Sequence, residues 1–140
     1  MTGMFLVMTS YCIDSNIVIY TLDGLEPVVT FMTDAQNQEI IYPVIVEAEL
    51  YSSSKLSSED MQDIRDVLDL GEIIEVNSTI GLIAGKLRRI SRSKYNQKLK
   101  LPDALVAATA INQFATLITR NYDDFKHLQN EGLEIYNPFV

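Results

Sequence analysis

Short apolar runs of strand length recur along the chain, separated by longer stretches in which apolar residues have helical spacing. The strands are expected at residues 11–13, 39–42, 72–76, 115–119 and 133–136. Helices are expected at 17–22, 28–37, 44–54, 59–70 and 78–92, from 102 onward, and in a short segment ending at 127 or 128. This alternation predicts an α/β fold with a central, mostly parallel sheet and helices on both faces. We find no repeat or linker, so we expect a single domain (11–140). Residues 1–10 are expected to form a short N-terminal extension that precedes it.

The stretch Tyr11 to Tyr20 contains a single acidic residue, Asp14, in an otherwise apolar run. A buried carboxylate is costly unless its environment satisfies it. The polar triplet that begins at Asp14 marks the carboxyl end of the strand, where parallel α/β sheets bind ligands. Ser15 and Asn16 are suited to cap the helix that follows. Asp14 is therefore a candidate metal ligand, with a simple helix cap as the alternative.

Three further acidic positions follow or lie beside strand ends. Glu49 belongs to the predicted helix 44–54, and it lies about 200° around that helix from Glu47, so the two cannot face one site. Asp103 lies in the first turn of a helix that Pro102 begins, where the helix dipole also favours an acid. The pair Asp123 and Asp124 follows the strand 115–119. Ordinary solvent-exposed or dipole-compensating roles are the alternatives for these acids.

The basic residues are concentrated in one segment of an otherwise acidic chain. A formal net charge of −8 over 140 residues argues against an anionic partner. Residues 86–100, however, contain seven of the eleven basic residues and no acid. A solvated helix face followed by a basic loop, residues 91–100, is the simpler interpretation. The functional interpretation is that this basic segment forms a rim that attracts the phosphate groups of a substrate to the acidic residues.

The chain has a single cysteine and a single histidine, which limits the disulfide and histidine-based catalytic chemistry it can carry. The one cysteine, Cys12, lies in the first apolar run, which predicts a buried, reduced thiol and a cytoplasmic protein without an internal disulfide. A catalytic Ser-His-Asp or Cys-His arrangement would depend on the one histidine, His127. We expect His127 to lie on the surface of a helix. Residues 1–10 have no positively charged start and too few apolar residues for a signal peptide or membrane span.

Carboxylates without histidine or cysteine partners select hard cations such as Mg²⁺ or Mn²⁺. Such an ion lowers the pKa of a bound water and orients it for in-line attack on phosphorus. The chain has no glycine-rich phosphate loop, cysteine cluster or His-Glu motif that would favour another chemistry. The acids therefore predict metal-assisted hydrolysis of a phosphate ester.

Four stretches in order carry a family resemblance, from Tyr11 to the C-terminus. They are I-D-S-N-I-V-I-Y, V-E-A-E-L, L-P-D-A-L-V-A-A-T-A and L-I-T-R-N-Y-D-D-F. Together they resemble the motif set of PIN-domain ribonucleases, particularly VapC-type toxins of toxin–antitoxin pairs. The resemblance implies that Asp14 and Asp103 hold the metal and that Glu49 completes the acidic site.

The last motif departs from a full acidic set. The family carries an acid or an asparagine directly after the strand, and this chain has Asn121 there, with Asp124 as the remaining acid. Ser15 and Asn16 match polar positions that support the first aspartate. The catalytic set implied by the resemblance is thus Asp14, Glu49, Asp103 and Asp124.

The family implies a Mg²⁺- or Mn²⁺-dependent endoribonuclease held inactive by a cognate antitoxin whose tail lies across the active site. It also implies a homodimer, for which an exposed apolar helix stripe in the middle third of the chain is the expected contact. We hypothesise that the basic segment guides RNA to the acids through Arg88, Arg89 and Arg92.

Two alternatives remain open. A non-catalytic PIN-like module that binds RNA or protein is favoured by Asn121, whereas the joint presence of Asp14, Glu49 and Asp103 favours an enzyme. A phosphoryl-transfer domain with Asp14 as nucleophile is the other. Aspartate-based phosphatases need a second aspartate two residues later, where this chain has Asn16, and the residue pattern of receiver domains is not apparent.

Overall fold

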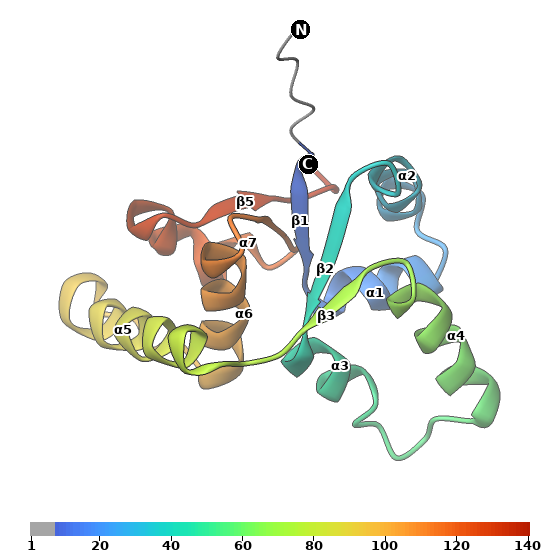
Figure 1. Ribbon diagram of the computed structural model, residues 1–140, viewed down its shortest axis with the longest axis horizontal. Helices are drawn as coiled ribbons and strands as arrows, with labels where there is room; N and C mark the ends of the chain where they lie inside the picture. Colours follow the sequence, from blue (N-terminus) through green and yellow to red (C-terminus); the bar gives the residue numbers. More distant parts are fainter. Residues whose placement is uncertain (1–7) are drawn as a thin grey trace, which may run out of the picture.

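A computed structural model describes residues 8–140, and its centre is a five-stranded, all-parallel sheet (Figure 1). The strand order is β3-β2-β1-β4-β5. The strands are β1 (Ser10–Ile13), β2 (Glu39–Pro43), β3 (Glu72–Ile74), β4 (Thr116–Ile118) and β5 (Glu134–Tyr136). The predicted α/β fold with a parallel sheet is confirmed.

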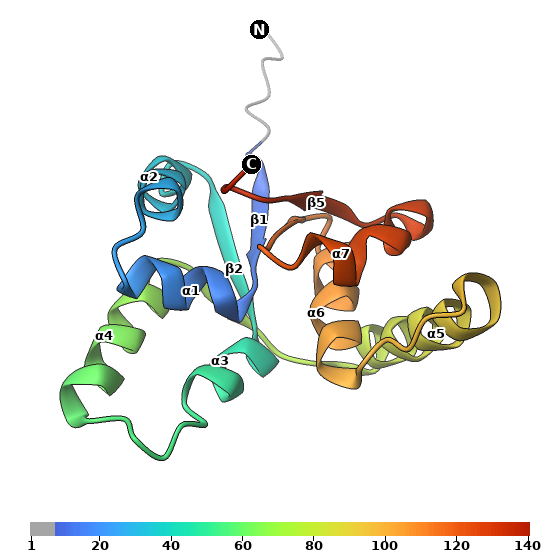
Figure 2. The same ribbon diagram turned by 180° about the vertical axis from the view of Figure 1, so that it is seen from behind.

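Seven α-helices and one 3₁₀ helix cover the sheet within residues 8–140. They are α1 (Ser15–Leu22), α2 (Glu26–Ala35), α3 (Val44–Leu50), α4 (Ser58–Leu68), α5 (Ser78–Tyr95), α6 (Leu101–Asn112), α7 (Tyr122–Phe125) and η1 (Lys126–Glu131). Helices α5 and α6 lie on one side of the sheet, and α1, α2 and α4 lie on the other (Figures 1 and 2). The predicted covering of both faces is therefore observed.

The central strand β1 is buried because both of its neighbours are strands and both faces of the sheet are covered. Cys12 is fully buried and lies in register with Ile41 of β2 and Leu117 of β4. Ile13 lies in register with Ile118. The next residue of each strand, Asp14 and Thr119, therefore emerges at the same carboxyl edge of the sheet.

Gly71 lies between α4 and β3, where the chain passes close to the backbone of β2. Gly71 does not have a positive φ, but a Cβ at this position would clash with the carbonyl group of Ile40 in β2. Tyr42, also in β2, donates a buried hydrogen bond of 2.8 Å to the carbonyl oxygen of Val67 in α4. Close approach of β2 and the end of α4 thus requires a residue without a side chain here.

The second half of the basic segment is more helical than predicted. Helix α5 continues to Tyr95, so residues 91–95 belong to a helix and the prediction of a loop over 91–100 is wrong there. The helix ends because Asn96 adopts a left-handed conformation with φ 51°, which directs the N–H of Gln97 to the carbonyl oxygen of Ser91. Ser91 is buried, which anchors this last part of the helix.

The prediction for His127 is wrong as well. Its side chain is only 7% exposed, and its Nε2 lies 2.8 Å from the Oγ of the buried Ser91. The contact joins η1 to α5, two elements far apart in sequence, so a local polar pattern could not reveal it. The buried thiol predicted for Cys12 is confirmed.

Most of the predicted N-terminal extension, residues 1–10, lies outside the described residues, and Ser10 already belongs to β1. Among the helices formed by residues 8–140, none combines the length and the apolar character needed to cross a membrane.

Candidate active site

Asp14 follows β1 and is almost completely buried, with 5% of its surface exposed. Its Oδ1 accepts a 2.8 Å hydrogen bond from the backbone N–H of Ser15. Its Oδ2 accepts from Nδ2 of Asn16 at 3.1 Å and from Oγ1 of Thr119 at 2.8 Å. Asp14 itself, with extended backbone, is the N-cap of α1, so the predicted cap at Ser15 and Asn16 is wrong. The carboxylate caps a helix and also faces the carboxyl edge of the sheet.

Thr119 is the residue that sequence analysis missed. It is fully buried at the end of β4, donates to Asp14, and accepts a 3.1 Å hydrogen bond from the backbone N–H of Asn121. Asn16 completes the network, because its Oδ1 accepts a 3.1 Å hydrogen bond from the backbone N–H of Arg120. A polar residue at the end of a predicted buried strand was the available signal, but its partner depended on the order of the strands.

Four acids from four separate segments interact electrostatically at this edge. Burial raises the pKa of Asp14, its three hydrogen bonds lower it, and Asp124 raises it further. Burial and then the charges of Asp14 and Asp124 raise the pKa of Asp103, and Lys100 lowers it. Burial, Asp14 and Asp103 raise the pKa of Glu49. The fold therefore gathers the end of β1, helix α3, the start of α6 and helix α7 around one acidic cluster.

Asp103 and Glu49 reach the cluster from the first turn of α6 and from α3. Pro102 and Asp103 are the second and third residues of α6, so the predicted helix start differs by one residue from the observed start at Leu101. Glu47 points elsewhere, as its position around the helix predicted, and forms a 2.9 Å ion pair with Arg65 of α4. Helix α3 ends at Leu50 rather than extending to 54.

The acids after β4 differ from each other. The Asp123 side chain is 88% exposed and pairs with Lys126 at 3.4 Å. Asp124, in contrast, influences the pKa values of both Asp14 and Asp103. Asn121 precedes α7 and contributes its backbone N–H to the Thr119 hydroxyl group. The structure therefore brings Asp124, not Asp123, toward the other acids.

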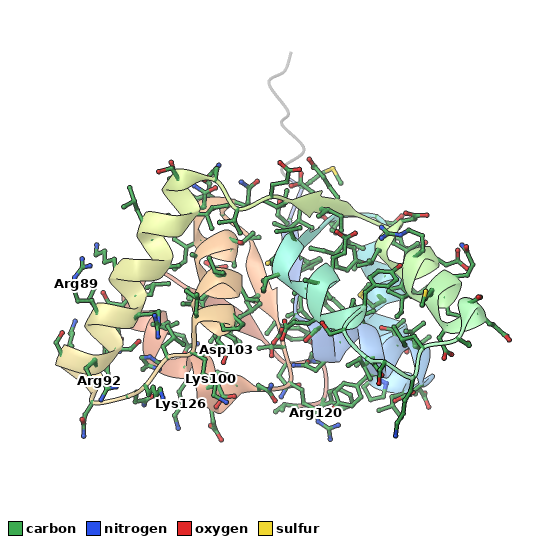
Figure 3. All side chains as sticks on the ribbon, turned by 90° about the horizontal axis from the view of Figure 1, so that it is seen from below. Arg89, Arg92, Lys100, Asp103, Arg120 and Lys126 are labelled. Carbon is green, nitrogen blue, oxygen red and sulfur yellow. The ribbon has the colours of Figure 1, made fainter. Side chains whose placement is uncertain are left out.

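The arginines of α5 lie away from the acids. Arg88 donates from Nε to the carbonyl oxygen of Leu99 at 3.0 Å, and it lines a small groove with Arg89 and Arg92. Figure 3 shows Arg89 and Arg92 at the outer side of α5, whereas Lys100 lies close to Asp103. Of the basic segment, Lys100 is thus the residue whose charge reaches the acidic cluster.

The donor set fits a hard divalent cation. An ionised carboxylate offers about four lone-pair positions, and the three hydrogen bonds to Asp14 leave one of these, on Oδ1, for a cation or its water. No three acid, histidine or cysteine side chains of residues 8–140 form a ready-made ligand cage. Mg²⁺ commonly uses only one or two carboxylates and keeps several waters, so this open arrangement suits it.

A parallel α/β domain with acids from separate segments at the carboxyl edge of its sheet is the arrangement expected of a PIN-like domain. Residues 11–131 match the family model described as "PIN domain", and the chain belongs to the PIN-domain family. The family predicted from the four sequence motifs is thereby confirmed.

A curated relative and two solved structures extend the comparison. The chain is 31% identical over 138 residues to Ribonuclease VapC2 of Rickettsia felis, covering 89% of this chain and 96% of the relative. The crystal structure of VapBC2 from Rickettsia felis bound to a promoter DNA fragment matches with a TM-score of 0.79 and 24% identity, over 92% of this chain and 98% of that one. DNA-bound VapBC from Salmonella typhimurium matches with a TM-score of 0.80 and 16% identity, over 94% and 99%. These two structures support the fold.

Proposed function

We propose that this protein is a divalent-metal-dependent endoribonuclease, a hydrolase that acts as the toxin of a toxin–antitoxin pair. The observation that carries the proposal is the gathering of Asp14, Glu49, Asp103 and Asp124 at the carboxyl edge of the sheet. The similarity to a protein named Ribonuclease VapC2 supports RNA as the substrate. A cytoplasmic location is consistent with that substrate.

Asp14 and Asp103 would hold Mg²⁺ or Mn²⁺. The bound ion supplies an activated water and neutralises charge that develops on the phosphate. Ser15, Asn16 and Thr119 fix the Asp14 carboxylate through hydrogen bonds, so its free lone pair keeps one direction. Glu49, whose pKa is raised, is suited to accept a proton from the attacking water at a carboxylate oxygen. Asp124 adds the fourth negative charge, and Asn121 supports it by tying α7 to Thr119.

RNA cleavage by wild type and by single Asp→Asn variants tests this proposal. We expect Asp14→Asn and Asp103→Asn to lower the cleavage rate by at least about 100-fold, because a metal ion contributes several kcal/mol to phosphoryl transition states. Asp124→Asn should also impair cleavage. Asp123→Asn is the matched control, because Asp123 is exposed and paired with Lys126, and it should retain the wild-type rate.

The same assay discriminates against a non-catalytic binding module. Wild type should cleave only when Mg²⁺ or Mn²⁺ is present and should stop when the ion is chelated. Folded wild type that binds RNA but does not cleave it at any metal concentration would favour the binding module instead. Equal rates for Asp14→Asn and wild type would exclude the acidic cluster as the site.

An antitoxin partner is supported by a groove that leads to the acids. Glu49 lines a groove of about 390 Å³ between α1, α3 and α4. Its lining combines apolar side chains, of which Ile19 and Leu22 are exposed, with the acids Asp23, Asp60 and Asp63. An inhibitory segment with an apolar face and basic side chains would complement this groove. One of the solved structures similar to this chain is a toxin–antitoxin complex from Klebsiella pneumoniae.

A homodimer remains a prediction. Helix α5 presents Leu82 with 74% of its surface exposed, and this residue lies in the middle third of the chain, where the apolar contact stripe is expected. Small-angle scattering at high protein concentration should give the mass of a dimer. A monomer under those conditions would contradict the prediction.

A further inference from the structure

Arg120 lies one residue beyond Thr119, at the edge of the sheet where the acids gather. Its backbone N–H donates to Oδ1 of Asn16, and both Asn16 and Thr119 donate to the Asp14 carboxylate. The Arg120 backbone is therefore linked to the Asp14 carboxylate through the side chain of Asn16.

Two aromatic rings hold the Arg120 side chain. Its Cζ lies 4.1 Å from the ring centroid of Phe139 and 5.0 Å from that of Tyr20. The two rings pack edge to face, with centroids 5.3 Å apart and planes at 77°. Cation–π attraction to both rings favours one position of the guanidinium group. The rings cannot accept its N–H groups as a carboxylate would, so these donors stay available.

Arg120 is exposed and forms no ion pair with any carboxylate of residues 8–140, although acids outnumber bases 19 to 11 in the chain. Figure 3 shows Arg120 on the same edge of the molecule as Lys100 and Lys126, with Asp103 beside the two lysines. Arg89 and Arg92 lie along α5, on the opposite side of Asp103 from Arg120. An acidic site repels RNA, so fixed cations next to it are needed to hold the substrate.

We propose that Arg120 binds a backbone phosphate of the RNA next to the acidic cluster, with its guanidinium group held in place by Tyr20 and Phe139. The RNA then follows the edge marked by Lys100 and Arg120, and the arginines of α5 contribute little. A planar guanidinium with a free edge donates two parallel hydrogen bonds to a phosphate. This inference rests on the proposed ribonuclease function, because it assumes that RNA is the substrate.

The alternative is that Arg120 serves only to attach the C-terminal segment to α1 through Phe139. Steady-state cleavage of a short single-stranded RNA in Mg²⁺, with thermal unfolding of the same samples, separates the two roles. We expect Arg120→Gln to raise KM by about 10-fold or more while kcat changes little, because a charge-assisted phosphate contact is lost. The slope of log kcat/KM against log salt should become shallower by about 0.7.

Matched variants make the test specific. Lys55→Gln removes one exposed positive charge from the loop between α3 and α4 and should leave KM within about twofold. Arg120→Lys retains a charge without the planar fork and should recover part of the loss. Phe139→Leu keeps the charge but loses the ring, and it should raise KM by less than Arg120→Gln.

Two results would overturn the proposal. One is an Arg120→Gln variant with the KM and salt slope of wild type. The other is a loss that appears only as a lower melting temperature, which is what an attachment role alone would produce. Wild type that cleaves no RNA would instead refute the proposed function, so the two failures are distinguishable.

Discussion

Asp14 combines a position that disfavours charge with hydrogen bonds that favour it. Burial raises the pKa of the carboxyl group, and the hydroxyl of Thr119, the backbone N–H of Ser15 and the amide of Asn16 all lower it. These hydrogen bonds hold the carboxylate in one orientation, in which it can bind a metal ion although other acids lie nearby. This balance depends most on Thr119, which is the largest of the three hydrogen-bond contributions to the pKa.

Replacing Thr119 with valine tests this balance. Thr119→Val keeps the shape of the side chain but removes the 2.8 Å hydrogen bond to Asp14 and the acceptor for the Asn121 N–H. We expect the free energy of unfolding at pH 7 to fall by about 2 kcal/mol, since hydrogen bonds to charged groups are worth roughly 1.5–3 kcal/mol. Metal affinity should fall as well. Urea unfolding and a metal titration measure the two effects.

Thr119→Ser is the control for that substitution. It retains the hydroxyl group and loses only a methyl group, so metal affinity should remain near the wild-type value while stability falls by about 1 kcal/mol. If Thr119→Val and Thr119→Ser bound metal equally well, the hydroxyl group would have no role in positioning Asp14.

The elements show which parts of the molecule local sequence can predict. The strands, the α4 capping box at Ser57 and Asp60, and the acids at the ends of β1 and at the start of α6 follow from hydrophobic spacing and capping chemistry. The roles of Thr119 and Arg120 do not, because they depend on β4 lying directly beside β1. The strand order 3-2-1-4-5 is set by packing of the whole sheet.

The contact between Ser91 of α5 and His127 of η1 could not be predicted from local sequence either. Because His127 titrates, this contact makes the stability of the protein depend on pH. Burial lowers the pKa of His127 from 6.5, while Glu131 raises it by a smaller amount. The unfolded chain therefore binds a proton more readily, and the stability from the neutral histidine is complete above about pH 6.5. That contribution is lost as the pH falls through the folded-state pKa.

We expect wild type to lose more stability than His127→Gln when the pH is lowered from 7.5 to 5.5. Glutamine does not titrate and can still bond to the Ser91 hydroxyl group, so the difference between the two proteins isolates the histidine. The extra loss can reach at most about 1.4 kcal/mol, because pH 5.5 lies one unit below the ordinary histidine pKa of 6.5 that the unfolded chain keeps. Urea unfolding at the two pH values gives the result, and parallel pH profiles would contradict it.

At the scale of the whole molecule, the parallel sheet sets the chemistry by bringing distant acids to one edge. Asp14 and Asp103 are separated by most of the chain, yet the charge of Asp14 raises the pKa of Asp103 because β1 and α6 are packed together, and both charges raise the pKa of Glu49 after burial does. The net charge of −8 makes a bound cation the natural compensation for this edge. A divalent ion that binds the folded state alone would also stabilise it.

Calorimetric titration of Mn²⁺ and Mg²⁺ into wild type, Asp14→Asn and Asp103→Asn tests the central claim most directly, because it requires neither the RNA target nor the antitoxin. We predict binding to wild type and its loss in both variants, with circular dichroism confirming that each variant is folded. Folded wild type that binds neither ion, or an Asp14→Asn variant that binds as wild type does, would contradict the assignment of these strand-edge acids as a metal site.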